Sequence, residues 1–278
     1  MDCKTAQSFL NNLVIAMLLL AMAACSNGSD AGPDCRYNEN WLNGQCRADP
    51  ITVTPITLPG GIWRGVDADN RDVVALVTVF GGFQFVDAFG NQGSGNLAVG
   101  DGHTVASNFQ LVTQQGATFA DGTTLANCTF SGTIVERQSL AMTQSCVTTA
   151  GLEFQESLVL QFDTLYNRDA SLAIIAGMYE TPAGSVLSIA SDGVIFVQDA
   201  VSGCVTNGQV RMTLSNANVY LYEYSIDNCT GADAIWNGSR FAGLAVLDDT
   251  ISPDSLIFAV IGDVGTVAIS MFVVNQRV

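Results

Sequence analysis

Residues 128–146, "CTFSGTIVERQSLAMTQSC", contain two runs of strand-forming residues that meet at a short polar break. Cys128 and Cys146 lie nine residues either side of Arg137. In a β-hairpin, residues equidistant from the turn face each other with Cα atoms about 4.5 to 5.5 Å apart, which suits a disulfide bond. The stretch therefore predicts two antiparallel strands that are joined by a disulfide between these cysteines.

A second pair of cysteines has the same relationship to a turn. Cys204 and Cys229 are centred on residues 216–217, within "TLSNANVYL", where two strand-like runs meet. Nearer the N-terminus, Cys35 and Cys46 enclose the short segment "CRYNENWLNGQC". We expect a second cross-strand disulfide between Cys204 and Cys229, and a small closed loop between Cys35 and Cys46.

Short similarities within the chain predict an internal duplication. They are "CTFSGTIV" from residue 128 with "CVTNGQVR" from residue 204, "FDTLYNRDASLAIIAG" (162–177) with "DDTISPDSLIFAVIG" (248–262), and "GIW" (61–63) with "GMY" (177–179). These matches indicate two related β units over residues 60–175 and 176–278. They also imply that the first unit carries an extra segment of some 40 residues, centred on "FQFVDAFGNQGSGNLAVGDGH".

Composition and periodicity favour an all-β fold. The chain is 48% hydrophobic and 13% charged, with 27 glycines, and its β-branched and aromatic runs are short and often separated by Asp-Gly or Asn-Gly pairs. No long stretch repeats its apolar residues with a helical period of 3.6. We expect an antiparallel meander that forms a barrel or a sandwich, in one body or two lobes.

The Gly-x-Trp of "GGIWRG" (60–65), at the start of a predicted strand, resembles the lipocalin-like barrels. In a barrel, an interior lined by Trp63, Phe83, Phe85 and Tyr179 would favour binding of a small apolar ligand. An integral outer-membrane barrel is the alternative for so apolar a meander. It fits less well because the chain ends "VVNQRV", without the terminal aromatic residue typical of that class.

The N-terminal segment predicts export. Residues 13–24, "LVIAMLLLAMAA", form an apolar run that is too short for a membrane-spanning helix but suits the core of a signal peptide. Met22-Ala23-Ala24-Cys25 resembles the bacterial lipobox, which implies that residues 1–24 are removed and that Cys25 is lipidated. An ordinary signal cleaved near Ala24, which would leave Cys25 as a free thiol, is the alternative.

The lipobox resemblance also bears on localisation and on the cysteine count. Ser26, rather than aspartate, follows Cys25, which implies passage to the outer membrane. Residues 25–59 would then form the lipid anchor and a tether that contains the Cys35–Cys46 loop. If Cys3 is removed and Cys25 is lipidated, six of the eight cysteines remain, an even number that suits an oxidising compartment.

Charge and residue content exclude several kinds of chemistry. The net charge is −16 and the only lysine is Lys4, so a basic face for nucleic acid is not expected. The absence of later lysines excludes P-loop and Schiff-base mechanisms. His103 is the only histidine, and with Asp101 it is expected in an exposed turn. We predict no catalytic residue, no metal site and no cofactor.

Three functions remain open. The first, which we favour, is a non-catalytic, lipid-anchored protein of the outer membrane that binds a small ligand or an envelope partner on its β scaffold. The second is a hydrolase of envelope glycans or peptides that uses carboxylates. The third is a structural or assembly subunit of the outer membrane. An internal cavity would favour the first, clustered carboxylates the second, and flat apolar patches the third.

Overall fold

The computed structural model describes residues 58–278, apart from 68, 88, 182, 183 and 266, together with the backbone of two short N-terminal strands. These strands, β1 (Glu39–Leu42) and β2 (Gln45–Ala48), pair antiparallel. The chain divides into two compact units, 1–55 and 56–278. The predicted signal peptide, the lipidation site Cys25 and the proposed bond between Cys35 and Cys46 lie outside the described side chains.

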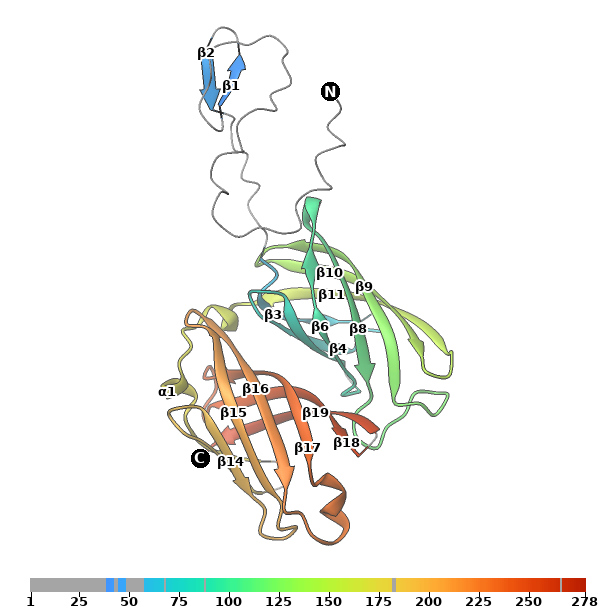
Figure 1. Cartoon of the computed structure of the whole chain (residues 1–278), viewed down its shortest axis with the longest axis vertical. Helices are drawn as coiled ribbons and strands as arrows, with labels where there is room; N and C mark the ends of the chain where they lie inside the picture. The colour runs from blue at the N-terminus through green and yellow to red at the C-terminus, as the bar shows by residue number, and fades with distance from the viewer. Residues whose placement is uncertain are drawn as a thin grey trace, which may run out of the picture. The chain divides into compact units, whose positions relative to one another are not determined.

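The second unit contains two closed antiparallel barrels of eight strands each. Figure 1 traces the strands of both. Its first barrel closes where β6 pairs with β8 and β11 pairs with β3, while the short β7 (Ala98–Val99) lies beside β8. The barrel strands are β3 (Gly61–Val66), β4 (Asp72–Val77), β5 (Gly82–Val86), β6 (Gln92–Asn96), β8 (Thr104–Val112), β9 (Leu125–Val135), β10 (Ser139–Thr148) and β11 (Glu153–Asp163).

The second barrel closes where β12 pairs with β19. Its strands are β12 (Gly177–Glu180), β13 (Val186–Ile189), β14 (Val194–Gln198), β15 (Val205–Leu214), β16 (Ala217–Asp227), β17 (Ser239–Asp248), β18 (Ser255–Val264) and β19 (Val267–Arg277). The segments η2 (Thr164–Asn167) and α1 (Leu172–Ile175) connect the barrels, and η3 (Gly231–Trp236) lies between β16 and β17. The predicted all-β, internally duplicated fold is confirmed, with barrels rather than a sandwich.

Alternation of buried and exposed residues along β8 to β11 explains how the first barrel holds together. Inward side chains such as Phe109, Phe130 and Leu140 are buried in one apolar cluster. The rings of Phe109 and Phe130 stack with centroids 4.2 Å apart. Outward positions on the same strands are mostly Ser, Thr, Asn, Gln and Glu, and they are exposed.

Two further apolar clusters complete the core. One fills the second barrel, and the other, which includes Ile62, contains residues of both barrels.

Both predicted hairpin disulfides are present. Cys128 and Cys146 are direct cross-strand partners on β9 and β10, with Cα atoms 4.1 Å apart, and Arg137 occupies the turn with a φ of 54°. Cys204 and Cys229 are bonded just outside the ends of β15 and β16, with Cα atoms 4.0 Å apart. The turn symmetry read from the sequence therefore gave the correct partners in both hairpins.

The sequence matches behind the predicted repeat are not all equivalent in the fold. "GIW" and "GMY" do begin the first strand of each barrel, β3 and β12. The two cysteine motifs do not correspond, because β9 is the sixth strand of its barrel and β15 is the fourth strand of its own. The predicted extra segment of the first unit is also wrong, because residues 82–96 form β5 and β6, two strands that the barrel needs.

Candidate binding cavity of the second barrel

A cavity of about 710 Å³ opens into the second barrel at the end where the 199–204 loop and η3 lie. Its apolar wall comes from inward side chains of five strands, including Leu187, Val197, Ile226, Phe258 and Val273. The first three strands of this barrel have four or five residues, whereas the last five have ten or eleven. The short strand β12 pairs only with Gln276 and Arg277 of β19, so the rest of β19 extends beyond it and leaves the barrel wall open at this end.

Aromatic rings form one side of the cavity. Tyr222 on β16 stacks on Phe258 on β18, with centroids 4.7 Å apart and planes 12° from parallel. Tyr224 lies edge-on to Phe258 at 6.4 Å and stacks on Phe241 at 5.1 Å. The segment η3 adds Trp236, whose ring is 6.3 Å from that of Phe241. Because each ring packs against another, the rings support one another and present apolar surface to an occupant.

A few polar groups reach this mainly apolar space. Asn275 on β19 is 1% exposed, and neither its Oδ1 nor its Nδ2 has a hydrogen-bond partner. The Tyr224 hydroxyl contacts only the Met271 sulfur, at 3.9 Å. Burial raises the pKa of the Tyr222 and Tyr224 hydroxyls above the usual value, so both remain neutral. Since unsatisfied buried amides are rare, Asn275 marks a place where a polar group of a ligand would be stabilised.

The charged groups of the cavity are carboxylates. Asp199 and Asp233 line it, and no basic side chain does among the residues that the structure describes. Asp199 accepts a hydrogen bond from the backbone N–H of Val201 at 2.8 Å, and this bond lowers the pKa of its carboxyl group. The cavity therefore favours neutral or cationic occupants over anionic ones.

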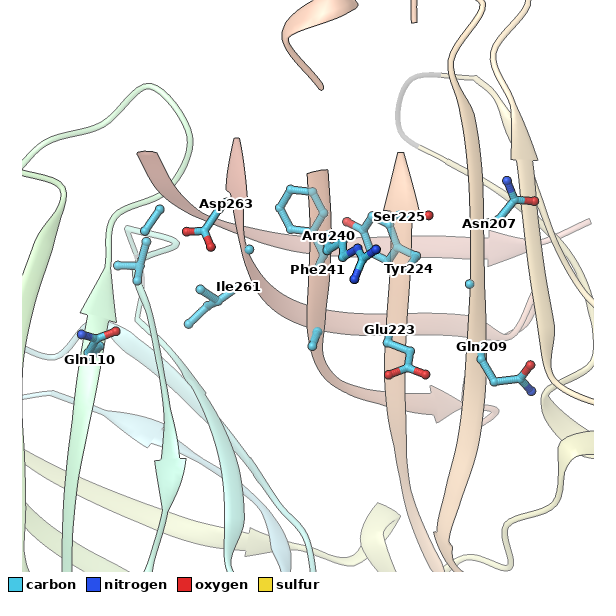
Figure 2. Close-up of a pocket in the computed structure, with 15 residues that line it drawn as sticks. Gln110, Asn207, Gln209, Glu223, Tyr224, Ser225, Arg240, Phe241, Ile261 and Asp263 are labelled. Atoms are coloured by element: carbon cyan, nitrogen blue, oxygen red, sulfur yellow. The ribbon is translucent and has the colours of Figure 1, made fainter. Parts of the chain in front are cut away.

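A second cavity, of about 670 Å³, lies on the outer face of the second barrel (Figure 2). Arg240 and Asp263 are register partners on β17 and β18, and Glu223 lies on β16. Glu223 forms an ion pair with Arg211 at 2.7 Å. Glu223 and Asp263 are two strands apart and two residues out of register, so their Cα atoms are roughly 12 Å apart. Glu223 is therefore ion-paired and distant from Asp263. The groove does not place these two carboxylates where both could act on one bond of a substrate.

The four residues predicted to line a binding site lie elsewhere. Trp63, Phe83, Phe85 and Tyr179 are all at least 95% buried inside the barrels. Phe83 and Phe85 both pack on Phe130 at about 5.5 Å. The Tyr179 hydroxyl donates to the carbonyl oxygen of Ile175 at 2.7 Å. None of the four lines either of the two cavities described above, because their rings pack inside the barrels.

Residues 67–72, "DADNRD", lead from β3 into β4 and contain an ion-pair network centred on Arg71. The Asp67 side chain is 3% exposed and accepts a hydrogen bond from Arg71 Nε at 2.6 Å. Arg71 also pairs with Asp69 at 3.0 Å and with Glu156 at 3.3 Å. Within residues 58–278 as described, no group of three or more His, Cys, Asp or Glu side chains could hold a metal ion. His103 lies in the exposed turn η1 (Asp101–His103).

The residues of the cavity were not singled out from the sequence, although one signal was available. In "NVYLYEYSI" (218–226), alternate positions place Tyr220, Tyr222 and Tyr224 on the same face of a strand. Three inward tyrosines on one strand bring hydroxyl groups into a barrel interior. Nothing in the local sequence distinguishes Asn275, since its environment is created by strands far away in the chain.

Comparisons with known proteins leave the family open. No protein-family model matches the chain, and no curated protein sequence matches it. A solved structure from Bacteroides fragilis, described as a "putative outer membrane protein", is similar at 12% identity with a TM-score of 0.26, over 80% of this chain and 98% of that one. In the described part of the chain, no helix has the length and apolarity needed to span a bilayer.

Proposed function

We propose that this chain is a non-catalytic protein of the bacterial cell envelope, lipid-anchored to the outer membrane through Cys25, and that it binds a small ligand or part of an envelope partner in the mainly apolar cavity of the second barrel. The observation that carries the binding function is the cavity of about 710 Å³ in that barrel. Ligand sites in proteins usually have volumes of about 300 to 1,000 Å³ and apolar walls with a few polar groups.

The nature of the walls supports a ligand rather than a reaction. Phe258, Val273 and Leu187 provide apolar surface, while Asn275 and the neutral Tyr222 hydroxyl offer hydrogen bonds. The carboxylates at the cavity, Asp199 and Asp233, lie on a loop and on η3. In these positions the two carboxylates would help to orient a bound molecule.

The envelope location is supported by the N-terminal sequence and by the disulfides. Met22-Ala23-Ala24-Cys25 follows an apolar run of signal-peptide length. Each of the two barrels contains one disulfide bond, and such bonds persist in oxidising compartments such as the periplasm. Both features agree with a protein that is exported and then anchored.

The outer surface of the first barrel supports a tethered rather than an embedded protein. Thr129, Ser131 and Thr133 point outward on β9, whereas Cys128, Phe130 and Ile134 point inward. A barrel in a lipid bilayer has the opposite arrangement, with an apolar outer band and a polar interior. The polar outer face is suited to contact with water.

Binding can be tested with the apolar fluorescent probe N-phenyl-1-naphthylamine on the full chain carrying Cys25→Ala. We expect saturable binding of one probe per chain. Val273→Trp places a large side chain in the cavity and should weaken binding at least about tenfold, because the probe loses contact area. Val194→Trp is the matched control, since Val194 is 45% exposed on the outer face of β14. Equal binding by both variants would contradict the proposed site.

A further inference from the structure

The strand β19 has one edge that is paired along almost its whole length and one that is mostly open. Ten register pairs join it to β18, and the two strands lie side by side in Figure 1. On the opposite edge, only Gln276 and Arg277 pair with β12. The strand β12 ends at Glu180, while β19 continues for nine more residues toward the open end of the barrel, from Asn275 back to Val267.

The directions of the backbone groups on β19 follow from three hydrogen bonds. Arg277 N–H donates to the carbonyl oxygen of Asp254, which precedes β18, whereas Val278 N–H donates to that of Met178 on β12. Ser270 N–H also points away from β18. Because successive residues of a strand point their N–H and C=O groups to opposite sides, the even-numbered residues face the open edge. Phe272 and Val274 therefore present two N–H and two C=O groups there, without a strand partner in the described chain.

The open edge already pairs with an extended segment at one point. Gln114, in the loop after β8, forms a parallel bridge with Ser270, and Ser270 N–H donates to the carbonyl oxygen of Thr113 at 3.3 Å. The gap in the barrel wall lies between this bridge and the β12 pairing at Gln276. It spans residues 271–275, about the length that a peptide of five extended residues would cover.

The cavity lies directly behind this gap. Phe272 and Val274 line it with their neighbours, and the side chains of Met271, Val273 and Asn275 face inward. Directly opposed residues of antiparallel strands have their side chains on the same face. A peptide residue placed opposite Val273 would therefore put its side chain into the cavity, while the two flanking residues would bond Phe272 and Val274.

We propose that the natural occupant is an extended peptide segment, neutral or basic, that adds to the open edge of β19 and inserts one apolar side chain into the cavity. This inference rests on the proposed function, since it names the class of ligand for the same cavity. The carboxylates Asp199 and Asp233 at the cavity favour a neutral or basic segment over an acidic one. Strand addition is an established way in which an exposed sheet edge binds a peptide.

Calorimetric titration of the full chain carrying Cys25→Ala with the peptide Ac-Lys-Val-Phe-Val-Lys-NH2 tests the proposal. The phenylalanine would enter the cavity and the two valines would pair with the edge. N-methylation of either valine removes a hydrogen-bond donor and should weaken binding about tenfold. N-methylation of the phenylalanine is the matched control, because its N–H would point away from β19. Equal affinities of the valine-methylated and phenylalanine-methylated peptides would overturn the proposal.

A change in the protein gives a second test of the same edge. Val274→Pro removes an N–H that faces the gap and leaves the ladder between β18 and β19 intact, a position where a strand tolerates proline. We expect about tenfold weaker peptide binding by this variant, while Val274→Thr, which keeps the N–H, retains it. Circular dichroism verifies that both variants are folded.

Two outcomes distinguish this inference from the function on which it rests. If N-phenyl-1-naphthylamine binds and the peptide does not, the cavity binds a different class of ligand and the strand-addition proposal is wrong. If neither probe binds, the ligand-binding function itself is wrong.

Discussion

Asn218 on β16 donates a hydrogen bond from Nδ2 to the carbonyl oxygen of Leu165 in η2, at 3.2 Å. The same nitrogen donates to the carbonyl oxygen of Leu247 on β17 at 2.7 Å, and Asn218 Oδ1 accepts from Leu247 N–H at 3.3 Å. Asn218 is 3% exposed. One amide thus satisfies three buried backbone groups and holds the connector between the barrels against the second barrel.

Replacing this amide should destabilise the protein. Asn218→Ala leaves the three backbone groups without partners, and each unsatisfied buried group costs about 1 to 3 kcal/mol before local rearrangement. We expect the free energy of unfolding in urea to fall by about 2 kcal/mol or more. Asn207→Ala is the control, since Asn207 is exposed on β15 of the same barrel, and it should change stability by less than about 0.5 kcal/mol.

The two hairpin disulfides should each contribute to stability. They close segments with sequence separations of 18 and 25 residues. The chain-entropy estimate for loops of this size is about 3 kcal/mol each. Replacing both Cys128 and Cys146 with alanine should lower the free energy of unfolding by about this amount. A change below about 1 kcal/mol would show that the reduced unfolded chain is already compact.

Peptide mapping without reduction should identify all the bonds. We expect peptides that join Cys128 to Cys146, Cys204 to Cys229, and Cys35 to Cys46. The first two pairs are present in the structure, whereas the third is an expectation from the sequence alone. A peptide that joins Cys35 to any cysteine other than Cys46 would refute the closed N-terminal loop.

The sequence predicts local features of this fold better than distant ones. The 128–146 hairpin could be placed in register because its two strands meet at one turn, so Arg137 determines which residues face each other. Closure of the first barrel depends on the pairing of Val66 with Val159, far apart in the chain, and no local pattern encodes it. The sequence does not indicate the cavity for the same reason, since Leu187 on β13 and Asn275 on β19 line one space only when β12 pairs with β19 and closes the second barrel.

Asp67 should make stability depend on pH in the acid range. Burial raises the pKa of its carboxyl group, but hydrogen bonds from Arg71 and from the backbone N–H of Asp69 outweigh this and hold the pKa below its usual value. Because the folded pKa is lowered, the contribution is complete above the unfolded pKa of about 3.9 and is lost as pH falls through the folded pKa. Asp67→Asn should therefore cost stability at pH 7 and little at pH 2, measured by urea unfolding.

The contribution of Glu156 to stability should depend on pH in the opposite direction. Burial is the largest effect on its carboxyl group and raises the pKa, while the Arg71 charge lowers it in part. A raised folded pKa contributes stability below the unfolded value of about 4.3, and this contribution is lost as pH rises through the folded pKa. The stability of Glu156→Gln relative to the unmodified protein should therefore increase from pH 4 to pH 7. A relative stability that decreases over this interval would contradict the direction of the shift.

The lipid anchor should be the only part of the protein that requires a membrane. Intact mass measurement of membrane-extracted protein should show a diacylglyceryl group on a chain that begins at Cys25. Three acyl chains would hold the protein firmly, whereas one chain gives only marginal binding. Cys25→Ala should release a folded protein into the periplasm, because the outward strand positions of the first barrel are polar and the net charge of −16 opposes self-association. If this variant folds only in detergent, the barrels are embedded and the tethered arrangement is wrong.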